Sequence, residues 1–545
     1  MSFVRRLLKV SSMAGAVGVY VPAMILQRGL GLARLLLLTW LFGQVDLPGQ
    51  IALWGLGLML LSLLTPLLPL GANHGLARYV SLFEARGMLV EFYRRIRLPV
   101  LACVLITTVI TGLFIGPIAS ALFSTSQAQP VARLLQLKIA LLGILNACVL
   151  ALYVNMLGFL AGMRLYRLIS AVELAFSVLF TVLAVVAVML WPSAVVLLMA
   201  HLVSVGITFV LGMLLLTLAL KVRHESAQPQ AYTPAPAPQE LPAEAGSAPM
   251  TKTAVTAQQQ VDPEVPDSFS RMFVRIARFG ITSMFSNSVW ILVTYMSFWL
   301  VSRRFGGDSA QAATYHIFFM LSQPVSVLAT AVWNAVSGHI AKQWETGLKY
   351  QATLNIQIAF KSVALCTLGL TAVIYLLSPL WVLALHPKYR DGITLVPGLL
   401  MFFQASANLG VLYLVAWLHE RPWVTLLGVL SGMGVMMMLA SWWMPLFNLD
   451  GASWAAGIGM FIGSGLITLP YLLFSGEKIA PGTYICFLSP ALLMLAVPFG
   501  AAVVLAAVAS LGIVSLFTPW LFDSRQKSLI WATLIKARSL LQRST

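Results

Sequence analysis

Two arginines in the first long apolar stretch are the side chains most able to do chemistry there. Arg28 lies near the middle of an apolar run over residues 12–42, and Arg34 follows six positions later. A charge at that depth in a membrane costs several kcal/mol unless it faces water or a partner. Because guanidinium groups match phosphate oxygens, the pair indicates a cationic cavity for an anion. The alternative is that each arginine caps a carbonyl or pairs with an interior carboxylate.

The geometry of a helix limits how this pair can act. Residues six apart project about 120° from each other, so the two side chains can line a wide cavity without pointing straight at one spot. Few carboxylates stand nearby, because most of the 17 Asp and Glu residues fall in loops, ends or a polar segment. A carrier of organic cations needs a buried carboxylate site, so this scarcity favours an anionic substrate.

Glu173 is the clearest intramembrane carboxylate. It lies early in the apolar run over residues 167–190. We consider three roles for it: an ion-pair partner of Arg28 or Arg34, a coupling residue, or a residue at the membrane interface.

Weaker polar candidates lie in the second half of the chain. Asn287 and His316 are expected to line the same cavity, and His316 is also a candidate for proton transfer. The more common fate of such side chains is an interhelical hydrogen bond. Arg275 and Arg278 start an apolar span, and together with Arg78 they are candidates for lipid-headgroup contact or for a gate that attracts a pyrophosphate.

The composition indicates that most of the chain lies in a lipid bilayer. Of 545 residues, 59% are hydrophobic and only 9% are charged, whereas soluble proteins average about 25% charged residues. The net charge of +17 sits in short segments between apolar runs, which is typical of membrane loops and argues against a nucleic-acid partner. We find no nucleotide-binding loop, no catalytic constellation and no paired cysteines, so we expect no enzyme activity, cofactor or metal.

The apolar runs predict an all-α integral membrane protein with about 14 transmembrane helices. The expected spans are 12–42, 50–72, 95–120, 132–160, 167–190, 194–220, 270–301, 311–338, 356–384, 393–418, 424–446, 451–474, 483–499 and 501–522.

These spans group as six, six and two. We expect an N-terminal six-helix lobe (1–221), a disordered cytoplasmic linker rich in Pro, Ala and Gln (222–268), a C-terminal six-helix lobe (269–476), an extra helix pair (477–523) and a basic amphipathic cytoplasmic tail (524–545).

The distribution of basic residues predicts the orientation. With the N-terminus placed in the cytoplasm, most of the 34 Lys and Arg residues fall on the cytoplasmic side. The opposite side holds Arg133, Lys138, Arg303, Arg304, Lys388 and Arg390. Both termini and the linker are therefore expected to be cytoplasmic. The two halves look related, because each runs from a span end through Phe-Gly (Phe42-Gly43 and Phe305-Gly306) and a short polar turn into a second span. Each lobe contains an even number of spans, so this repeat is expected to be direct, with a pseudo-two-fold axis along the membrane normal.

Three motifs carry a resemblance to a known family. Gly29-Leu-Gly-Leu-Ala-Arg34, Leu41-Phe-Gly43 and Leu70-Gly-Ala-Asn-His-Gly-Leu-Ala-Arg-Tyr-Val80 resemble the polysaccharide exporter family of the multidrug, oligosaccharidyl-lipid and polysaccharide flippase superfamily. The resemblance implies two six-helix lobes around a central cavity and flipping of polyprenyl-pyrophosphate-linked oligosaccharides between leaflets.

The first span also resembles that of the lipid II flippases, a sister branch. In that branch two arginines at this spacing line the cavity, which implies such a role for Arg28 and Arg34. The Pro-Asn and Glu-Gly-Ala stretch characteristic of that branch is not found in Leu60–Arg78.

We therefore expect a flippase of the bacterial cytoplasmic (inner) membrane. It would move a polyprenyl-pyrophosphate-linked glycan, a cell-envelope polysaccharide precursor, from the inner to the outer leaflet by alternating access. Membrane lipids and cell-envelope synthesis enzymes are the expected partners. The alternatives are a lipid II flippase, a cation or drug antiporter of the same superfamily, and a non-transporting scaffold of an envelope synthesis complex.

Overall fold

The structure is a computed structural model. It describes residues 7, 13–72, 76, 79–80, 83–84, 88–123, 133–226, 269–345, 347–419, 421–475, 479–528 and 530–531. All regular elements in these residues are helical. Most of the predicted linker (227–268) and of the predicted tail (532–545) lies outside the described residues.

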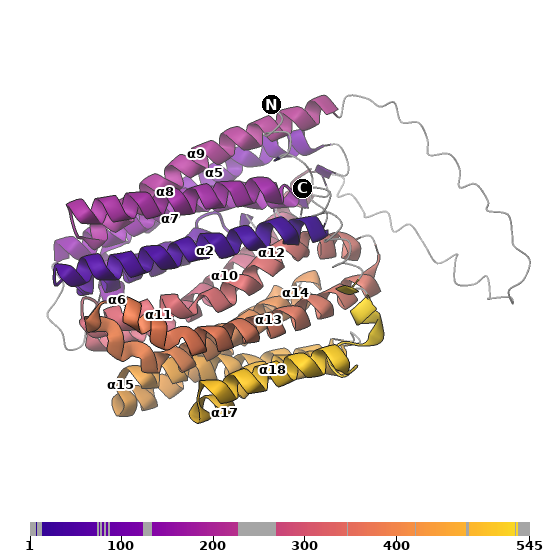
Figure 1. Ribbon diagram of the computed structural model, residues 1–545. Coiled ribbons are helices and arrows are strands. Elements are labelled where there is room, and N and C mark those ends of the chain that lie inside the picture. The colour runs from indigo at the N-terminus through magenta and orange to yellow at the C-terminus, as the bar shows by residue number, and fades with distance from the viewer. Residues whose placement is uncertain are drawn as a thin grey trace, which may run out of the picture.

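The first half of the chain forms one group of long helices. They are α2 (Met13–Gln44), α3 (Gly49–Leu67), α5 (Leu89–Leu113), α6 (Ile115–Phe123), α7 (Arg133–Gly162), α8 (Tyr166–Leu190) and α9 (Ala194–Ser226). Within this group α2 packs on α8, α7 on α9, and α3 on α7. In Figure 1 these are the indigo to magenta helices in the upper part of the molecule.

The last helix of this group runs a few residues further than the sequence predicts. The predicted boundary follows residue 221, but α9 continues to Ser226. Arg223 in its final turns forms an ion pair with Glu84 and donates a hydrogen bond to the carbonyl of Met163 at 3.3 Å. These contacts with neighbouring helix ends stabilise the extra turn of α9.

The second half forms another group. Its helices are α10 (Phe269–Phe305), α11 (Ala310–Ser322), α12 (Pro324–Glu345), α13 (Lys349–Ala384), the short η2 (Pro387–Leu395), α14 (Val396–Leu418) and α15 (Pro422–Phe474). Here α10 and α14 pack on α15, and α12 packs on α13 and α14. These are the pink to light-orange helices in the middle and lower part of Figure 1.

Helix α15 is a hairpin of two arms. Its 53 residues would extend about 80 Å if straight, and Asn448 breaks the helix with φ 50 and ψ −126. Glycines allow the two arms to pack closely. A Cβ on Gly459 would meet Met436, and a Cβ on Gly463 would meet the Ser431 carbonyl. The two predicted spans 424–446 and 451–474 are these arms.

A C-terminal helix pair covers the second group. It consists of α16 (Pro481–Phe487), α17 (Ser489–Ala496), η3 (Val497–Phe499) and α18 (Ala501–Phe517). α16 and α18 pack on α13, and α17 packs on α14. Gln526, which follows α18, accepts a hydrogen bond from the buried Lys361 Nζ at 3.0 Å.

The predicted number of spans agrees with the helices. Within the described residues, ten helices are long and apolar enough to cross a membrane, or twelve when each of two bent pairs counts as one span. The hairpin of α15 adds a crossing, and the 17-residue α18 completes the C-terminal pair. Large apolar side chains such as Leu113, Leu466 and Phe517 are exposed on the outside, as expected of a multi-pass membrane protein whose surface faces lipid.

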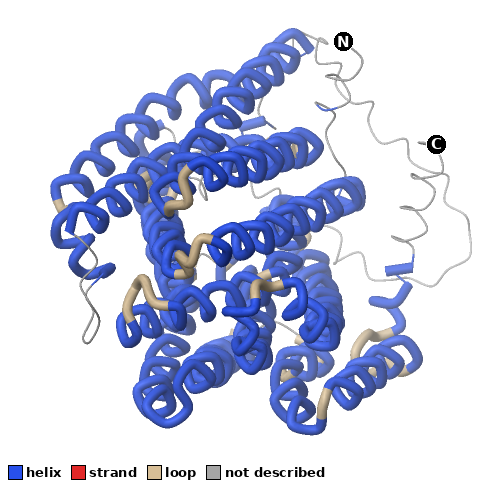
Figure 2. Tube along the Cα trace, turned by 60° about the vertical axis from the view of Figure 1, so that its left-hand side comes forward, coloured by secondary structure: helices blue, strands red, loops and turns tan. Residues whose placement is uncertain are grey.

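The two groups meet along a few helices. α2 contacts α12, and α3 contacts α10 and α11. Figure 2, which views the molecule from another side, shows how long helices run alongside one another across its depth. A cavity at this junction is therefore bordered by both lobes.

Candidate functional site

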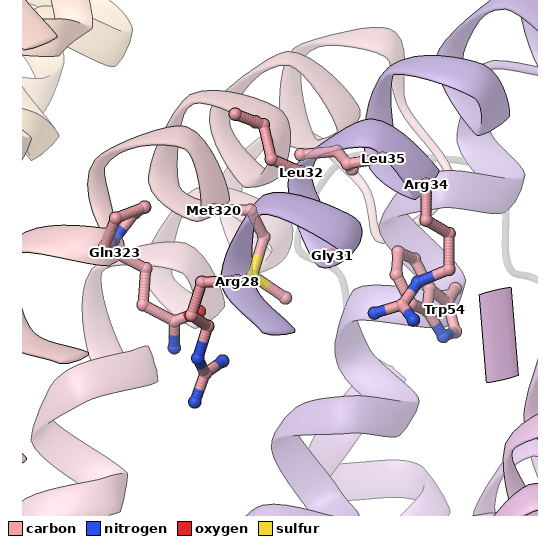
Figure 3. Close-up of a pocket in the computed structure, with 9 residues that line it drawn as sticks. Arg28, Gly31, Leu32, Arg34, Leu35, Trp54, Met320 and Gln323 are labelled. Atoms are coloured by element: carbon pink, nitrogen blue, oxygen red, sulfur yellow. The ribbon is translucent and has the colours of Figure 1, made fainter. Parts of the chain in front are cut away.

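A pocket lies where the middle of α2 faces the break between α11 and α12. Its lining consists of Arg28, Gly31, Leu32, Arg34 and Leu35 of α2, Trp54 of α3, and Met320, Gln323 and Pro324. The empty volume, including the space through which the pocket opens outward, is about 510 Å³. Figure 3 shows both arginine side chains extending to the same side of α2, toward Gln323 and Trp54.

Arg34 is held in place by α8. Its guanidinium carbon lies 4.0 Å from the centroid of the Phe180 ring, and one terminal nitrogen donates a hydrogen bond to Thr181 Oγ1 at 3.3 Å. Stacking on an aromatic face stabilises a cation without neutralising it. Its Nε is buried and has no partner among the described residues. The charge of Arg34 is therefore positioned yet still able to bind an anion.

Arg28 is less constrained. It is exposed to the open space beside α2, and no hydrogen bond or direct ion pair joins it to another described residue. The charges of Arg34 and Glu173 act on it through space, one repelling and one attracting. Two like charges with no acidic residue among the described pocket lining are costly in a membrane interior, and a bound anion relieves that cost.

Four lining residues come from other helices, namely Trp54, Met320, Gln323 and Pro324, and none of them was assigned to the cavity from the sequence. Trp54 is on α3, and Met320 and Gln323 stand at the end of α11. Gln323 and Pro324 form the junction at which α11 and α12 bend by 42°, because proline cannot donate the backbone hydrogen bond that would continue the helix. A proline next to a glutamine inside an apolar run was the available signal for this break.

A polar cluster joins the lobes on the side of the pocket nearer the start of α2. Tyr20 donates a hydrogen bond to Glu173 Oε1 at 3.5 Å and accepts one from Asn334 of α12 at 3.4 Å. Tyr166 of α8 donates to the carbonyl of Asn334 at 2.8 Å. Glu173 is half-buried inside this cluster, so it lies at the junction of the two lobes; its role stays a prediction.

The lobes also meet on the other side of the pocket. Trp40 Nε1 donates to the carbonyl of Ala384 at 2.8 Å, and its ring packs edge-on against His386. Lys388 donates to Asp46 in the loop after α2. This hydrogen bond, together with the ammonium charge, holds the pKa of the Asp46 carboxyl below its usual value.

Glycines allow close backbone approaches between the lobes. A Cβ on Gly49 would lie 2.0 Å from the backbone carbonyl oxygen of Asp308. At the opposite end of α3, a Cβ on Gly71 would lie 1.9 Å from the carbonyl oxygen of Gly280. We call these two backbone contacts the Gly49 seam and the Gly71 seam. They lie at opposite ends of the junction, with the pocket between them.

The other predicted site residues lie elsewhere. His316 is fully buried against Phe298 and Trp54, and neither ring nitrogen has a partner among the described residues. Asn287 is half-buried on α10, and neither residue lines the pocket. Arg278 is exposed near the start of α10. Arg78 and the side chain of Arg275 lie outside the described residues. The functional roles assigned to all of these side chains stay predictions.

No known family model and no curated protein sequence matches this chain. Solved structures do match it. A mutant of the Vibrio cholerae MATE transporter VcmN covers 86% of this chain and 98% of its own length, with 14% identity and a TM-score of 0.52. A MOP superfamily transporter from Pyrococcus furiosus covers 90% and 98%, with 16% identity and a TM-score of 0.55.

A third similar structure is an outward-facing multidrug resistance MATE family transporter of the MOP superfamily. It covers 86% of this chain and 97% of its own, with 16% identity and a TM-score of 0.52. The chain therefore has the two-lobe fold of the MATE transporters of the MOP superfamily. This is the arrangement of two six-helix lobes that the resemblance in sequence implied.

Proposed function

We propose that this protein is a flippase for a polyprenyl-pyrophosphate-linked oligosaccharide, acting by alternating access in a bacterial cytoplasmic membrane. The observation that supports this proposal is the pocket between the lobes, whose described lining includes Arg28 and Arg34 and no acidic residue. Guanidinium groups present several donors in a plane and bind phosphate oxygens in pairs. A pyrophosphate supplies the negative charge that balances these two arginines.

The contacts around the pocket suggest how it would work. The pyrophosphate binds Arg28 and Arg34, and the polyprenyl tail stays in lipid outside the lobes. The Gly49 seam and the Gly71 seam separate in turn, so the pocket opens to one side of the membrane at a time. Glu173 attracts Arg28 in the empty protein, and an incoming pyrophosphate competes with it for the guanidinium group.

One similar structure supports a change of substrate within this fold. The Pyrococcus furiosus protein is described as having a binding pocket of reverse polarity that suggests a different function. In the present chain, the pocket lined by Arg28 and Arg34 fits an anionic substrate. The distribution of basic residues supports cytoplasmic termini, and hence movement from the inner to the outer leaflet.

Flipping of a fluorescent polyprenyl-pyrophosphate sugar in proteoliposomes tests the proposal. Losing a charge-assisted hydrogen bond costs about 1.5–3 kcal/mol, so we expect Arg28→Ala and Arg34→Ala each to slow flipping by about 10- to 150-fold. Arg97→Ala is the control, because Arg97 is exposed on α5 and lies outside the pocket. Full flipping by folded Arg28→Ala and Arg34→Ala proteins contradicts the proposal.

A cation or drug antiporter is the second candidate. Glu173 favours it as a membrane-embedded carboxylate that contacts Tyr20, and the similar solved structures include multidrug resistance transporters. Under this candidate function, Glu173→Gln abolishes proton-driven uptake of a cationic dye in proteoliposomes. Dye uptake that needs Glu173, combined with no sugar-lipid flipping, decides for the antiporter.

A further inference from the structure

A second cavity lies far from the arginine pocket. It is a groove between the last turns of α10 and the first arm of α15, with an empty volume of about 730 Å³. Its walls are mainly apolar: Leu300, Met437, Ala440 and Met444. Methionine side chains adapt their shape to flexible apolar ligands. The groove is therefore suited to an alkyl chain.

Two cations stand at one edge of this groove. Arg303 and Arg304 end α10, and both line the cavity and are exposed. Their guanidinium carbons lie 5.3 Å and 5.9 Å from the ring centroids of Trp299 and Phe305. No carboxylate forms an ion pair with either of them in the described part of the chain.

The location of these arginines needs an explanation. They lie at the end of α10 that faces away from the chain's most basic segments, on the side where membrane proteins carry few positive residues. The neighbouring surface faces lipid, because Met438 and Trp442 on the same arm of α15 are 62% and 76% exposed. Exposed tryptophan is enriched at headgroup level, which would place the arginines near the depth of lipid phosphates.

We propose that this groove binds one anionic phospholipid of the surrounding leaflet. The phosphate accepts hydrogen bonds from Arg303 and Arg304, and one acyl chain lies along the methionines. A single molecule satisfies both features, since it carries a negative headgroup next to an alkyl chain. The two arginines together select for net negative charge over a zwitterionic headgroup.

Native mass spectrometry of the full-length protein in detergent tests this assignment with phosphatidylglycerol as the probe. A basic residue near a membrane surface contributes about fivefold to the binding of anionic lipid. The double variant Arg303→Gln/Arg304→Gln is therefore expected to bind phosphatidylglycerol about 30-fold more weakly. The matched control is Arg94→Gln/Arg97→Gln, which removes the same charge from exposed positions of α5 outside the groove and is expected to leave the binding of the first, tightest phosphatidylglycerol unchanged.

A second variant tests the groove without changing charge. Ser441 lines the cavity and is exposed, so Ser441→Phe fills it while the fold is kept, and binding is expected to weaken. Three results would overturn the proposal: equal loss in the α5 control, equal binding of phosphatidylcholine, or displacement of the lipid by millimolar inorganic phosphate. The last result would identify a site for a soluble anion instead. A melting curve confirms that each variant is folded.

Discussion

The Gly49 seam allows a prediction about conformational balance. In Gly49→Ala the new Cβ would lie 2.0 Å from the Asp308 carbonyl oxygen, whereas ordinary contacts begin at 3.4 Å. Both sides of the seam are backbone, so no side chain can move aside. Overpacking of this kind costs about 1–3 kcal/mol. The closed state of this end should therefore lose population relative to the open state by about 5- to 150-fold.

The Gly71 seam gives the opposite variant. In Gly71→Ala the Cβ would lie 1.9 Å from the Gly280 carbonyl oxygen, and the residue also has φ +73, which L side chains rarely adopt. This change should favour opening at the other end of the junction. Gly112→Ala is the control, because a Cβ there meets nothing within 4 Å.

Pulsed electron–electron distance measurements between spin labels check both variants, after the four native cysteines are replaced. Labels at Leu47 and Ala310 report on the end with the Gly49 seam, and labels at Met88 and Leu348 report on the other end. All four positions are exposed. We expect Gly49→Ala to lengthen the first distance and Gly71→Ala to lengthen the second.

The reasoning fails in two cases. One is a folded Gly49→Ala protein whose Leu47–Ala310 distances match those of the unaltered protein. The other is a variant in which the wrong pair of labels separates. Either result would mean that the two seams do not control which end opens.

Three further outcomes follow from the structure. The Asp46–Lys388 contact depends on a carboxyl whose pKa is lowered in the folded protein. The contact is therefore fully present above the ordinary Asp pKa of 3.8 and is lost as pH falls through the lower folded value. Asp46→Asn should abolish this pH dependence, which is measured as the spin-label distance across that end. Asn448→Gly should raise thermal stability by about 1 kcal/mol, because Asn448 has a positive φ that glycine adopts without strain, and a lower melting temperature would contradict this. Gln526→Ala should lower stability by about 1–3 kcal/mol, since it leaves the buried Lys361 Nζ without its acceptor. The double variant Lys361→Met/Gln526→Ala should recover most of this loss in the same melting assay.

The sequence predicted the spans well because lipid imposes a simple rule. An apolar run near 20 residues forms a helix, since its backbone groups have no other partner in hydrocarbon. Even the hairpin of α15 is predictable as two spans, because the polar stretch around Asn448 and Asp450 interrupts the apolar run. The helix ends were harder, as α9 shows, because tertiary contacts such as Arg223 with Glu84 decide the last turns.

The pocket was only partly predictable. Arg28 and Arg34 stand out in sequence because charge is rare at that depth, and the structure places both in one pocket. Trp54 and Gln323 lie on other helices, and nothing local reveals which of their faces points at α2. His316 is a polar residue in a span that does not line this pocket. Gly55 leaves the space that its ring fills.

The two seams also determine how the protein responds to its surroundings. The closest contact in each is backbone against backbone, so neither contact contains a charged group that salt can screen. Salt and acid therefore act on this end of the junction through the Asp46–Lys388 pair beside the Gly49 seam, and not through the backbone atoms of either seam. The backbone contacts of both seams therefore keep the same fit when the salt concentration around the membrane changes.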